Sequence, residues 1–352
     1  MKKNKALLLF GALCLASCST SAETVQIFIY DSADPFIASL KESLFSKLEG
    51  HYSYQTYMAE RKQTTQNQQI IDAIDDKSTK IMVVNTVDRL ASSAIIEKAE
   101  SVSPKVPVIF MNREPLESDL QPADDEWVWS NCYYVGSDPA YEGQLQAEMA
   151  DELFGGASNW STSKYNKNGD DKVQVVVIKG EQGHQDTELR SKNCVEKLRE
   201  LGYNVEIVAT ENCNWERDLA KKAMANLYSD SIELLFSNND EMALGAIDYL
   251  NSYANEETNS SASSSVDSSL PFDERFFPIF GVDATSDGRA AVRSGYMDGT
   301  VLNDASTQAS IISGLIDHFL KGGDLPSGSD KIIKEQNYYH VIGTKITKDN
   351  LR

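Results

Sequence analysis

Two kinds of hydrophobic spacing alternate along the chain from about residue 24. Runs such as "TVQIFIYD" (24–31) and "KIMVVNTV" (80–87) are typical of strands, whereas "PFIASLKESLFSKLEG" (35–50) has apolar residues at helical spacing. The core of the second run, "IMVVN", is apolar throughout, which favours a parallel sheet covered on both faces. The alternation predicts a doubly wound α/β sheet. Its other expected members are strands at 52–59 and 106–114 and helices at 61–76 and 89–101.

The same alternation restarts near residue 132 and predicts a second α/β unit. The expected strands are 132–138, 173–180, 204–211, 232–240 and 276–283, and the expected helices are 141–156, 186–202, 215–229 and 241–254. A chain of 352 residues is also longer than one core usually fills, which favours two domains. The acidic segment 117–132 is interpreted as the approach to a linker, and the Ser-rich segment 255–275 as a disordered surface insertion.

The N-terminus has the plan of a secretory signal. "MKKNKALLLFGALCLASC" is a basic start followed by an apolar run that is too short to span a bilayer. It ends in "LASC", which resembles the lipobox of bacterial lipoproteins, and this resemblance implies cleavage before Cys18 and lipidation of Cys18. Residues 1–18 are then the signal with its lipidated cysteine, and 19–23 a tether. Plain secretion with an incidental Cys18 is the alternative. No second apolar run is long enough to span a membrane.

Charge and cysteine content narrow the possibilities. The net charge of −20 argues against nucleic acid as a partner, because phosphate binding needs clustered Lys and Arg. Beyond Cys14 and Cys18 the chain has only Cys132, Cys194 and Cys213, which is too few for a disulfide framework. A bridge between Cys194 and Cys213 stays open.

Candidate chemistry gathers where the predicted strands end. In "GEQGHQDTELR" (180–190), His184, Asp186 and Arg190 follow an apolar run, and they suit an acid/base site, a structural ion pair or a polar grip on a ligand. Ligands of open α/β sheets bind beyond the carboxyl ends of the strands. Many side chains there, with charges and amides mixed, predict a ligand dense in hydroxyl groups. Besides His184, Asp186 and Arg190, the side chains at or near predicted strand ends are Tyr30, Asp31, Asp34, Phe36, Asn112, Arg113, Trp215, Asn239, Asp240 and Asp283.

Each of these residues taken alone also has an ordinary structural interpretation. Asp34 and Asp283 could cap helices, His184 could cap a helix or join an ion pair, and Trp215 could belong to a core. The argument for a ligand site therefore rests on the set and its order along the chain.

Seven separated motifs carry a resemblance to a known family. The chain resembles the periplasmic sugar-binding proteins of ABC transporters, of the type I periplasmic binding protein fold, and within them the glucose/galactose-binding proteins. This likeness runs from about residue 24 to the C-terminus, except for the Ser-rich segment. The motifs are "IYDSADPF", "FMNREP", "YYVGSD", "KGEQGHQDTELR", "SNNDEMALGA", "FGVDA" and "GTVLNDA".

The resemblance implies a site and a role. It places on the polar groups of D-glucose or D-galactose the residues Asp34, Asn112, Arg113, His184, Asp186, Arg190, Asn239, Asp283 and Asn303, with Phe36 and Trp215 on the ring faces and Tyr30 nearby. Carboxylates and amides suit the hydroxyl rim of a pyranose, and aromatic rings suit its faces. Arg113 stands where the family usually has lysine. The implied protein is a monomeric, non-enzymatic cell-envelope lipoprotein that serves an ABC permease and also suits a chemoreceptor.

The family's three chain crossings would fall near Ser137, Asn303 and Tyr339. The implied first domain is 24–136 plus 303–338, and the second is 137–302 plus 339–352. These two doubly wound parallel-sheet domains would be joined by a three-segment hinge.

The family also carries a calcium loop, and here its place is taken by "KYNKNGDDKVQ" (164–174), with Glu233 as the distant ligand. Ca²⁺ prefers several hard, charged oxygens. Lys164 stands where the first carboxylate belongs, Asn168 replaces another acid, and two extra residues precede Gln174. We expect a loop that is empty or binds Ca²⁺ weakly, in which Lys164 can reach Glu233 as a substitute counter-charge, and we expect no other cofactor.

Two other functions share parts of this pattern. A glycosidase would use Asp34 and Asp186 as its carboxylate pair. A site that wraps one ring on both faces and all edges leaves no room for an aglycone or an attacking water.

A cytoplasmic sugar-responsive repressor shares the fold, but the export signal and the lack of an N-terminal helix-turn-helix argue against it.

Overall fold

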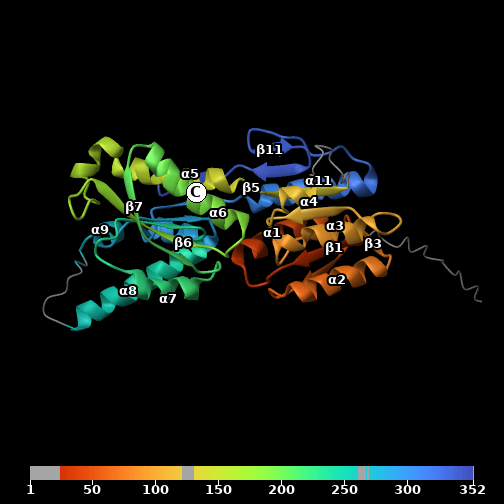
Figure 1. Ribbon diagram of the computed structural model, residues 1–352, viewed down its shortest axis with the longest axis horizontal. Coiled ribbons are helices and arrows are strands. Elements are labelled where there is room, and N and C mark those ends of the chain that lie inside the picture. Colours follow the sequence, from red (N-terminus) through yellow and green to blue (C-terminus); the bar gives the residue numbers. More distant parts are fainter. Residues whose placement is uncertain (1–23, 121–130, 261–266, 268, 352) are drawn as a thin grey trace, which may run out of the picture.

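The computed structural model describes residues 24–120, 131–260, 267 and 269–351. Two lobes lie side by side, and each is a sheet covered by helices on both faces (Figure 1). This arrangement confirms the predicted fold of two α/β domains with mostly parallel sheets. Within the described ranges, no helix has both the length and the apolar character needed to cross a membrane. The lipobox and Cys18 lie outside these residues.

The first sheet has the strand order β11-β12-β5-β4-β3-β1-β2, and of these strands only β11 runs antiparallel to its neighbour. Val25, Ile27 and Ile29 point into one core and Phe28 into the other, as the two-residue period of a strand requires. The strands are β1 (Thr24–Ile29), β2 (Ser53–Met58), β3 (Thr79–Val84), β4 (Val108–Met111), β5 (Cys132–Ser137), β11 (Ile332–Glu335) and β12 (Tyr338–Val341).

Helices bury apolar stripes on both faces of this sheet. α1 (Pro35–Leu48) and α11 (Ala305–Lys321) share one core, although they are remote in sequence. α2 (Gln63–Asp75) and α3 (Ser92–Glu100) pack on the other face. Two short elements, η1 (Arg89–Ala91) and α4 (Glu117–Leu120), complete the described part of the lobe.

The second sheet has the order β13-β10-β9-β8-β6-β7, with β13 antiparallel to β10. Val173, Val175 and Val177 face the core shared with α5 and α6, while Val176 and Ile178 face the core shared with α7, α8 and α10. The elements are β6 (Lys172–Lys179), β7 (Asn204–Asn212), β8 (Leu234–Ser237), β9 (Ile279–Val282), β10 (Gly299–Leu302), β13 (Thr344–Thr347), α5 (Pro139–Phe154), η2 (Ala157–Thr162), α6 (Gln185–Glu200), α7 (Arg217–Leu227), α8 (Asp240–Ser260), α9 (Phe272–Arg275) and α10 (Ser286–Ser294).

The chain passes between the sheets at three places. The first follows β5 at Ser137, the second follows β10 at Asn303, and the third joins β12 to β13. This last crossing lies a few residues later than the expected position near Tyr339. Tyr339 pairs with Val135 in the first sheet and is fully buried there, so the chain leaves this domain only after β12 ends at Val341.

The Ser-rich segment is more ordered at its ends than the prediction of a disordered insertion over 255–275 allowed. α8 continues to Ser260, and α9 forms at Phe272–Arg275. Phe272 is buried against Phe276 in the second domain, and this apolar anchor explains why the end of the segment is structured. Residues 261–266 and 268 lie outside the described residues.

The three cysteines in the described part of the chain, Cys132, Cys194 and Cys213, are buried and free. Cys194 and Cys213 belong to cores on opposite faces of the second sheet. The bridge between them that the sequence left open is therefore absent.

Candidate ligand site

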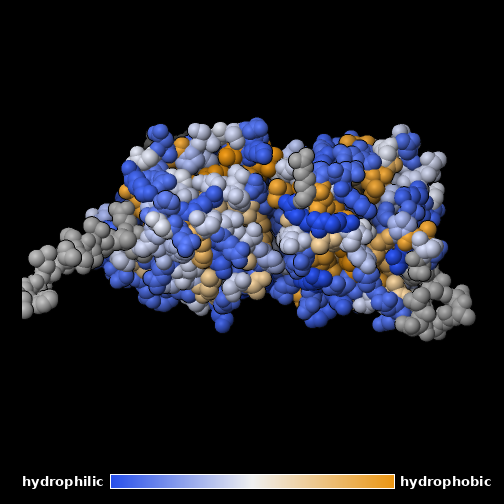
Figure 2. Space-filling view, turned by 180° about the vertical axis from the view of Figure 1, so that it is seen from behind, coloured by the Kyte–Doolittle hydropathy of each residue, from blue (hydrophilic) through white to orange (hydrophobic). Residues whose placement is uncertain are grey.

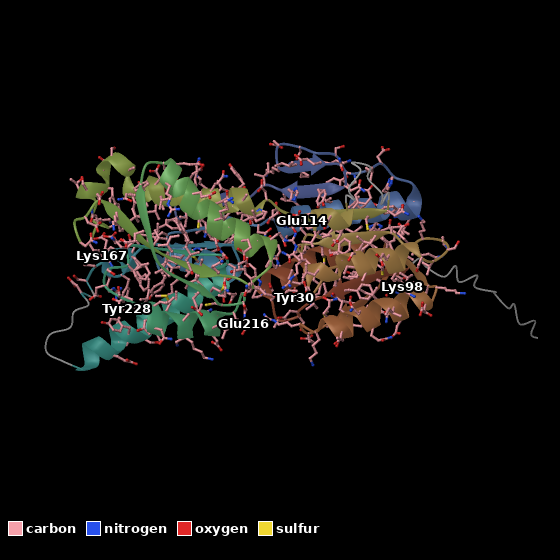
Figure 3. The ribbon with its side chains drawn as sticks, viewed as in Figure 1. Tyr30, Lys98, Glu114, Lys167, Glu216 and Tyr228 are labelled. Atoms are coloured by element: carbon pink, nitrogen blue, oxygen red, sulfur yellow. The ribbon has the colours of Figure 1, made fainter. Side chains whose placement is uncertain are left out.

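One cavity between the two domains gathers the predicted sugar-binding residues, with the exception of Arg113. Its free volume is about 20 Å³, so the side chains of the two domains lie close together around it. Tyr30 marks this junction of the lobes in Figure 3. The lining residues are Tyr30, Asp34, Phe36 and Asn112 from the first domain, His184, Asp186, Arg190, Trp215, Asn239 and Asp283 from the second, and Asn303 at a crossing.

Asp34 combines the capping role with a place in the cavity. Its Oδ1 accepts a hydrogen bond from the backbone N–H of Ile37 at 3.0 Å, which caps α1, and its Oδ2 accepts from the hydroxyl of Tyr30 at 2.5 Å. Pro35 follows at the first helical position, where its fixed φ is favourable. The carboxylate is thus held in one orientation at the edge of the cavity, and Phe36 lines the cavity two residues later.

Three cavity residues have left-handed backbone conformations. The φ angles are +64° at Asn112, +69° at Trp215 and +107° at Asp283. Such values are uncommon for residues other than glycine, cost free energy, and persist where the surrounding structure imposes them. The conformation of Asn112 is imposed by its neighbours, because its Oδ1 accepts a hydrogen bond from Asn85 at 3.2 Å and its carbonyl accepts one from Gln185 at 2.6 Å. The strain supports a functional rather than a purely structural role for these positions.

His184 caps α6 and presents a donor to the cavity. Its Nδ1 accepts a hydrogen bond from the backbone N–H of Asp186 at 3.1 Å, so the ring proton belongs on Nε2. Burial, followed by the charges of Arg113 and Arg190, holds the pKa of His184 well below its usual range. The imidazole is therefore neutral at pH 7. It lies edge-on to the Trp215 ring, with 5.1 Å between ring centres.

Asp186 and Arg190 form a buried pair on α6. Asp186 Oδ2 lies 3.0 Å from Arg190 Nη2, and Asp186 Oδ1 accepts from Gln185 Nε2 at 2.9 Å. Burial raises the pKa of Asp186, and the charge of Arg190 opposes this shift. Arg190 is itself bound by Glu142, whose Oε2 lies 2.7 Å from Nε, and by the carbonyl of Asn238 at 2.9 Å from Nη1. The trio singled out in the sequence is thus one fixed network.

The remaining polar residues come from three loops. Asn239 Oδ1 accepts from the backbone N–H of Met242 at 2.9 Å, which turns its amide N–H₂ toward the carbonyl of Trp215. Asp283 Oδ1 accepts from Asn303 Nδ2 at 3.3 Å. Burial raises the pKa of Asp283 well above its usual range, and the charge of Arg190 opposes this shift.

Arg113 does not line this cavity, contrary to the sequence prediction. It lines a neighbouring cavity, together with Val87 and Glu181. Its Nη1 donates to the carbonyl of Val87, its Nη2 lies 2.7 Å from Glu181 Oε2 of the second domain, and its guanidinium stacks 3.9 Å from the Tyr30 ring centre. The planar guanidinium group of arginine binds acceptors at fixed positions, and these partners hold the Arg113 side chain outside the candidate sugar cavity.

Three residues of the site escaped the sequence analysis. Glu142 binds Arg190, Gln185 bridges Asp186 to the carbonyl of Asn112, and Asn85 holds the Asn112 side chain. Of these three, only Glu142 could have been found from the sequence. It is a charged residue on the apolar stripe of α5 that continues through Leu145 and Met149, which indicates a buried acid.

The loop 164–174 does not fit Ca²⁺. Glu233, its distant acid, already accepts backbone hydrogen bonds from Lys167 at 2.7 Å and Gln174 at 3.2 Å. Lys164 pairs with Glu274 at 2.6 Å rather than with Glu233, contrary to expectation. Lys167 binds Glu233 through its backbone N–H, whereas its ammonium lies 5.4 Å from the Phe277 ring centre. Nowhere in the described residues do three or more His, Cys, Asp or Glu gather to hold a metal ion.

Comparison with known proteins identifies relatives over almost the whole chain. Residues 25–324 match the family described as "Periplasmic binding protein domain". The "D-galactose/methyl-galactoside binding periplasmic protein MglB" of Haemophilus influenzae is 29% identical over 348 residues, which cover 97% of this chain and 94% of that protein. A "Putative rhizopine-binding protein" of Rhizobium meliloti is 31% identical over 263 residues, 74% of this chain and 70% of the relative.

Solved structures share the fold at lower identity. A solute-binding protein of Actinobacillus succinogenes with bound D-allose superposes with a TM-score of 0.71 at 18% identity, covering 93% of this chain and 98% of that one. One from Bacillus halodurans with bound myo-inositol has a TM-score of 0.70 at 19% identity, covering 94% and 96%. These likenesses establish the architecture and leave the ligand to be argued from the site.

Proposed function

Because the chain belongs to the periplasmic binding protein domain family, we propose that it binds a monosaccharide, D-glucose or D-galactose, between its domains and delivers it to an ABC transporter permease. The observation that carries the proposal is a cavity lined from both domains by polar side chains and by aromatic rings, among them Phe36 from the first domain and Trp215 from the second. A ligand in this cavity would contact both domains at once. It would thereby favour the closed form, which is the form a permease has to distinguish.

The residue chemistry suits a pyranose. Asp34 and Asp186 are acceptors for hydroxyl groups, and the neutral His184 offers a donor at Nε2. Hydrogen bonds with an ionised partner are the stronger ones, which favours a sugar held by carboxylates and arginine along its rim. The two rings suit the C–H faces of the sugar. The galactose named for the Haemophilus influenzae relative agrees with this chemistry.

The family is one of binding proteins, not enzymes, which excludes the hydrolase with an Asp34/Asp186 pair. Both carboxylates also have fixed partners in the protein. Asp34 caps α1 and accepts from Tyr30, and Asp186 is held by Arg190. An acid/base pair would need one carboxyl free to pass a proton to a leaving group.

The proposal includes attachment of the protein to the cell-envelope membrane through lipid on Cys18, as the "LASC" motif implies. Cys18→Ser should move the protein from the membrane fraction to the soluble fraction or leave its signal uncleaved. Unchanged membrane fractionation would contradict the anchor without affecting the sugar proposal. The same closed form would be the signal for a chemoreceptor, which the family resemblance also implies.

Isothermal titration of the mature protein tests the ligand. We expect affinity for D-glucose or D-galactose to exceed affinity for D-allose, D-ribose and myo-inositol. If D-allose, D-ribose or myo-inositol binds most tightly, the proposed ligand is wrong but the proposed role as a binding protein stands. No binding of any member of the panel would refute monosaccharide binding altogether.

A further inference from the structure

A buried acid lies directly behind the ligand site and is not part of its lining. Glu142 is fully buried on α5, and its Oε2 lies 2.7 Å from both Nε and Nη2 of Arg190. The same Nη2 lies 3.0 Å from Asp186 Oδ2, which faces the cavity. A continuous chain of charged contacts therefore runs from Glu142 through Arg190 to a ligand-facing carboxylate.

The position of Glu142 depends on the close approach of two helices. α5 and α6 approach so closely at Gly143 that a Cβ atom there would lie 2.6 Å from the carbonyl oxygen of Arg190. Only glycine permits this contact, which brings the neighbouring Glu142 against the guanidinium. The carbonyl of Asn238 accepts from Nη1 on the other side, so the guanidinium is held on both sides.

Glu142 also touches two of the three chain crossings. The hydroxyl of Ser137, at the first crossing, donates to its Oε2 at 3.1 Å. At the third crossing, a Cβ atom on Gly343 would lie only 3.1 Å from Cγ of Glu142. The acid that binds Arg190 is thus hydrogen-bonded to the first crossing and lies close to the third, the segments about which the domains would turn.

From these contacts we infer that Glu142 is a positioning residue for the ligand site. It binds Arg190 from behind, and Arg190 then orients Asp186 toward one hydroxyl group of the ligand. Without the Glu142 charge, the Arg190 guanidinium would lose one of its two acidic partners and shift toward Asp186. The Asp186 carboxylate would then no longer point at its ligand hydroxyl. This inference rests on the proposed sugar-binding function, and it names a determinant of that function outside the lining of the cavity.

The test compares Glu142→Gln with two reference variants, by titration with the best-bound sugar and its monodeoxy analogues. Asp186→Asn identifies the hydroxyl that donates to Asp186, because removal of that hydroxyl should cost less affinity in this variant, whose neutral amide oxygen still accepts but without charge assistance. Met149→Ala is the matched control, since Met149 is buried on the same helix but lies in the core shared with β6 and β10. It should lower thermal stability and leave affinity unchanged.

Glu142→Gln should weaken binding of the parent sugar about tenfold, the effect of one charge-assisted contact. It should also lose discrimination at the hydroxyl that Asp186→Asn identifies, and only there. Parent-like affinity, or an equal loss for every analogue, would overturn the inference. If Glu142→Gln does not fold, Ser137→Ala removes one donor to the same carboxylate. About threefold weaker binding confined to the same hydroxyl is expected, and unchanged binding overturns the inference.

Absence of sugar binding by the wild-type protein would refute the proposed function, and this inference with it. That result differs from one in which the variants bind like the wild type. In that case the wild-type protein still binds sugar, and only the role of Glu142 is refuted.

Discussion

Arg113 and Glu181 form an ion pair that joins the two domains. Arg113 Nη2 of the first domain lies 2.7 Å from Glu181 Oε2 of the second, and the arginine side chain is only 4% exposed. A second pair, Arg61 with Glu216 at 2.6 Å, also joins the domains (Figure 3, where Glu216 is labelled). Opening of the cleft would separate both pairs, whereas the three crossings would remain. Figure 2 shows from behind the narrow waist that divides the lobes.

The Arg113–Glu181 pair should slow ligand release. Glu181→Gln should weaken sugar affinity about fivefold, mainly through faster dissociation, because the pair stabilises only the closed form. The dissociation rate is measured by stopped-flow fluorescence of Trp215 and the other tryptophans. Asp75→Asn is the control, since it breaks an ion pair with Lys98 that lies within the first domain. Equal dissociation rates in Glu181→Gln and wild type would refute the role.

Trp215 and Asp283 should carry much of the affinity. Trp215→Ala removes a ring from the cavity, and Asp283→Ala removes an acceptor held by Asn303. Each change should weaken sugar binding roughly ten- to a hundredfold, or about 1.5–3 kcal/mol, and leave the fold intact. Calorimetric titration and circular dichroism measure the two effects. Trp160→Phe is the matched control, because Trp160 is buried near β6 with its N–H on the Lys172 carbonyl, away from the cavity. Parent-like binding by both site variants would contradict the assigned site.

The loop 164–174 should not respond to Ca²⁺. Both Glu233 oxygens accept backbone N–H groups, and Lys167 supplies the positive charge nearby. A ligand raises stability only if it binds the native state, so the melting temperature should be equal in excess Ca²⁺ and in chelator. Lys167 lies at the end of its lobe remote from Tyr30 in Figure 3, so sugar concentration is simply held constant. A shift of several degrees would show that Asp170 or its neighbours bind the ion.

Two carboxyls outside the cavity lining, those of the buried Asp240 and the half-buried Asp298, should make the protein less stable as the pH rises. Burial raises the pKa of Asp240 and of Asp298 to about 7, from a usual value of 3.8. Between these values the folded protein binds protons that the unfolded chain has released, so the free energy of unfolding contributed by each group falls as pH increases toward 7.

Asp298→Asn isolates this effect, since the amide oxygen can still accept from the backbone N–H of Ile279. The variant should match wild type at pH 4 and exceed its melting temperature at pH 8, measured by thermal unfolding at fixed ionic strength. A difference between the two proteins that does not change with pH would contradict the assignment of a raised pKa to Asp298.

The local pattern of the sequence predicted most of the fold and of the cavity lining. Strand and helix periods are properties of neighbouring residues, so the alternating elements were readable, as was the polar residue at each strand end. Parallel strands bring those ends to one edge, and therefore His184, Asp186 and Trp215 could be assigned to one site before any contact was known.

The contacts of long charged side chains were decided only by the tertiary structure. Arg113 and Glu181 are 68 residues apart and belong to different domains, and Arg190 and Glu142 are 48 apart. Lys164 and Lys167 are three positions apart, yet Lys164 pairs with Glu274 and the Lys167 ammonium lies over the Phe277 ring. A flexible side chain can reach any acceptor within several ångströms, so its partner is determined by how domains and helices pack, and local sequence carries no record of that packing.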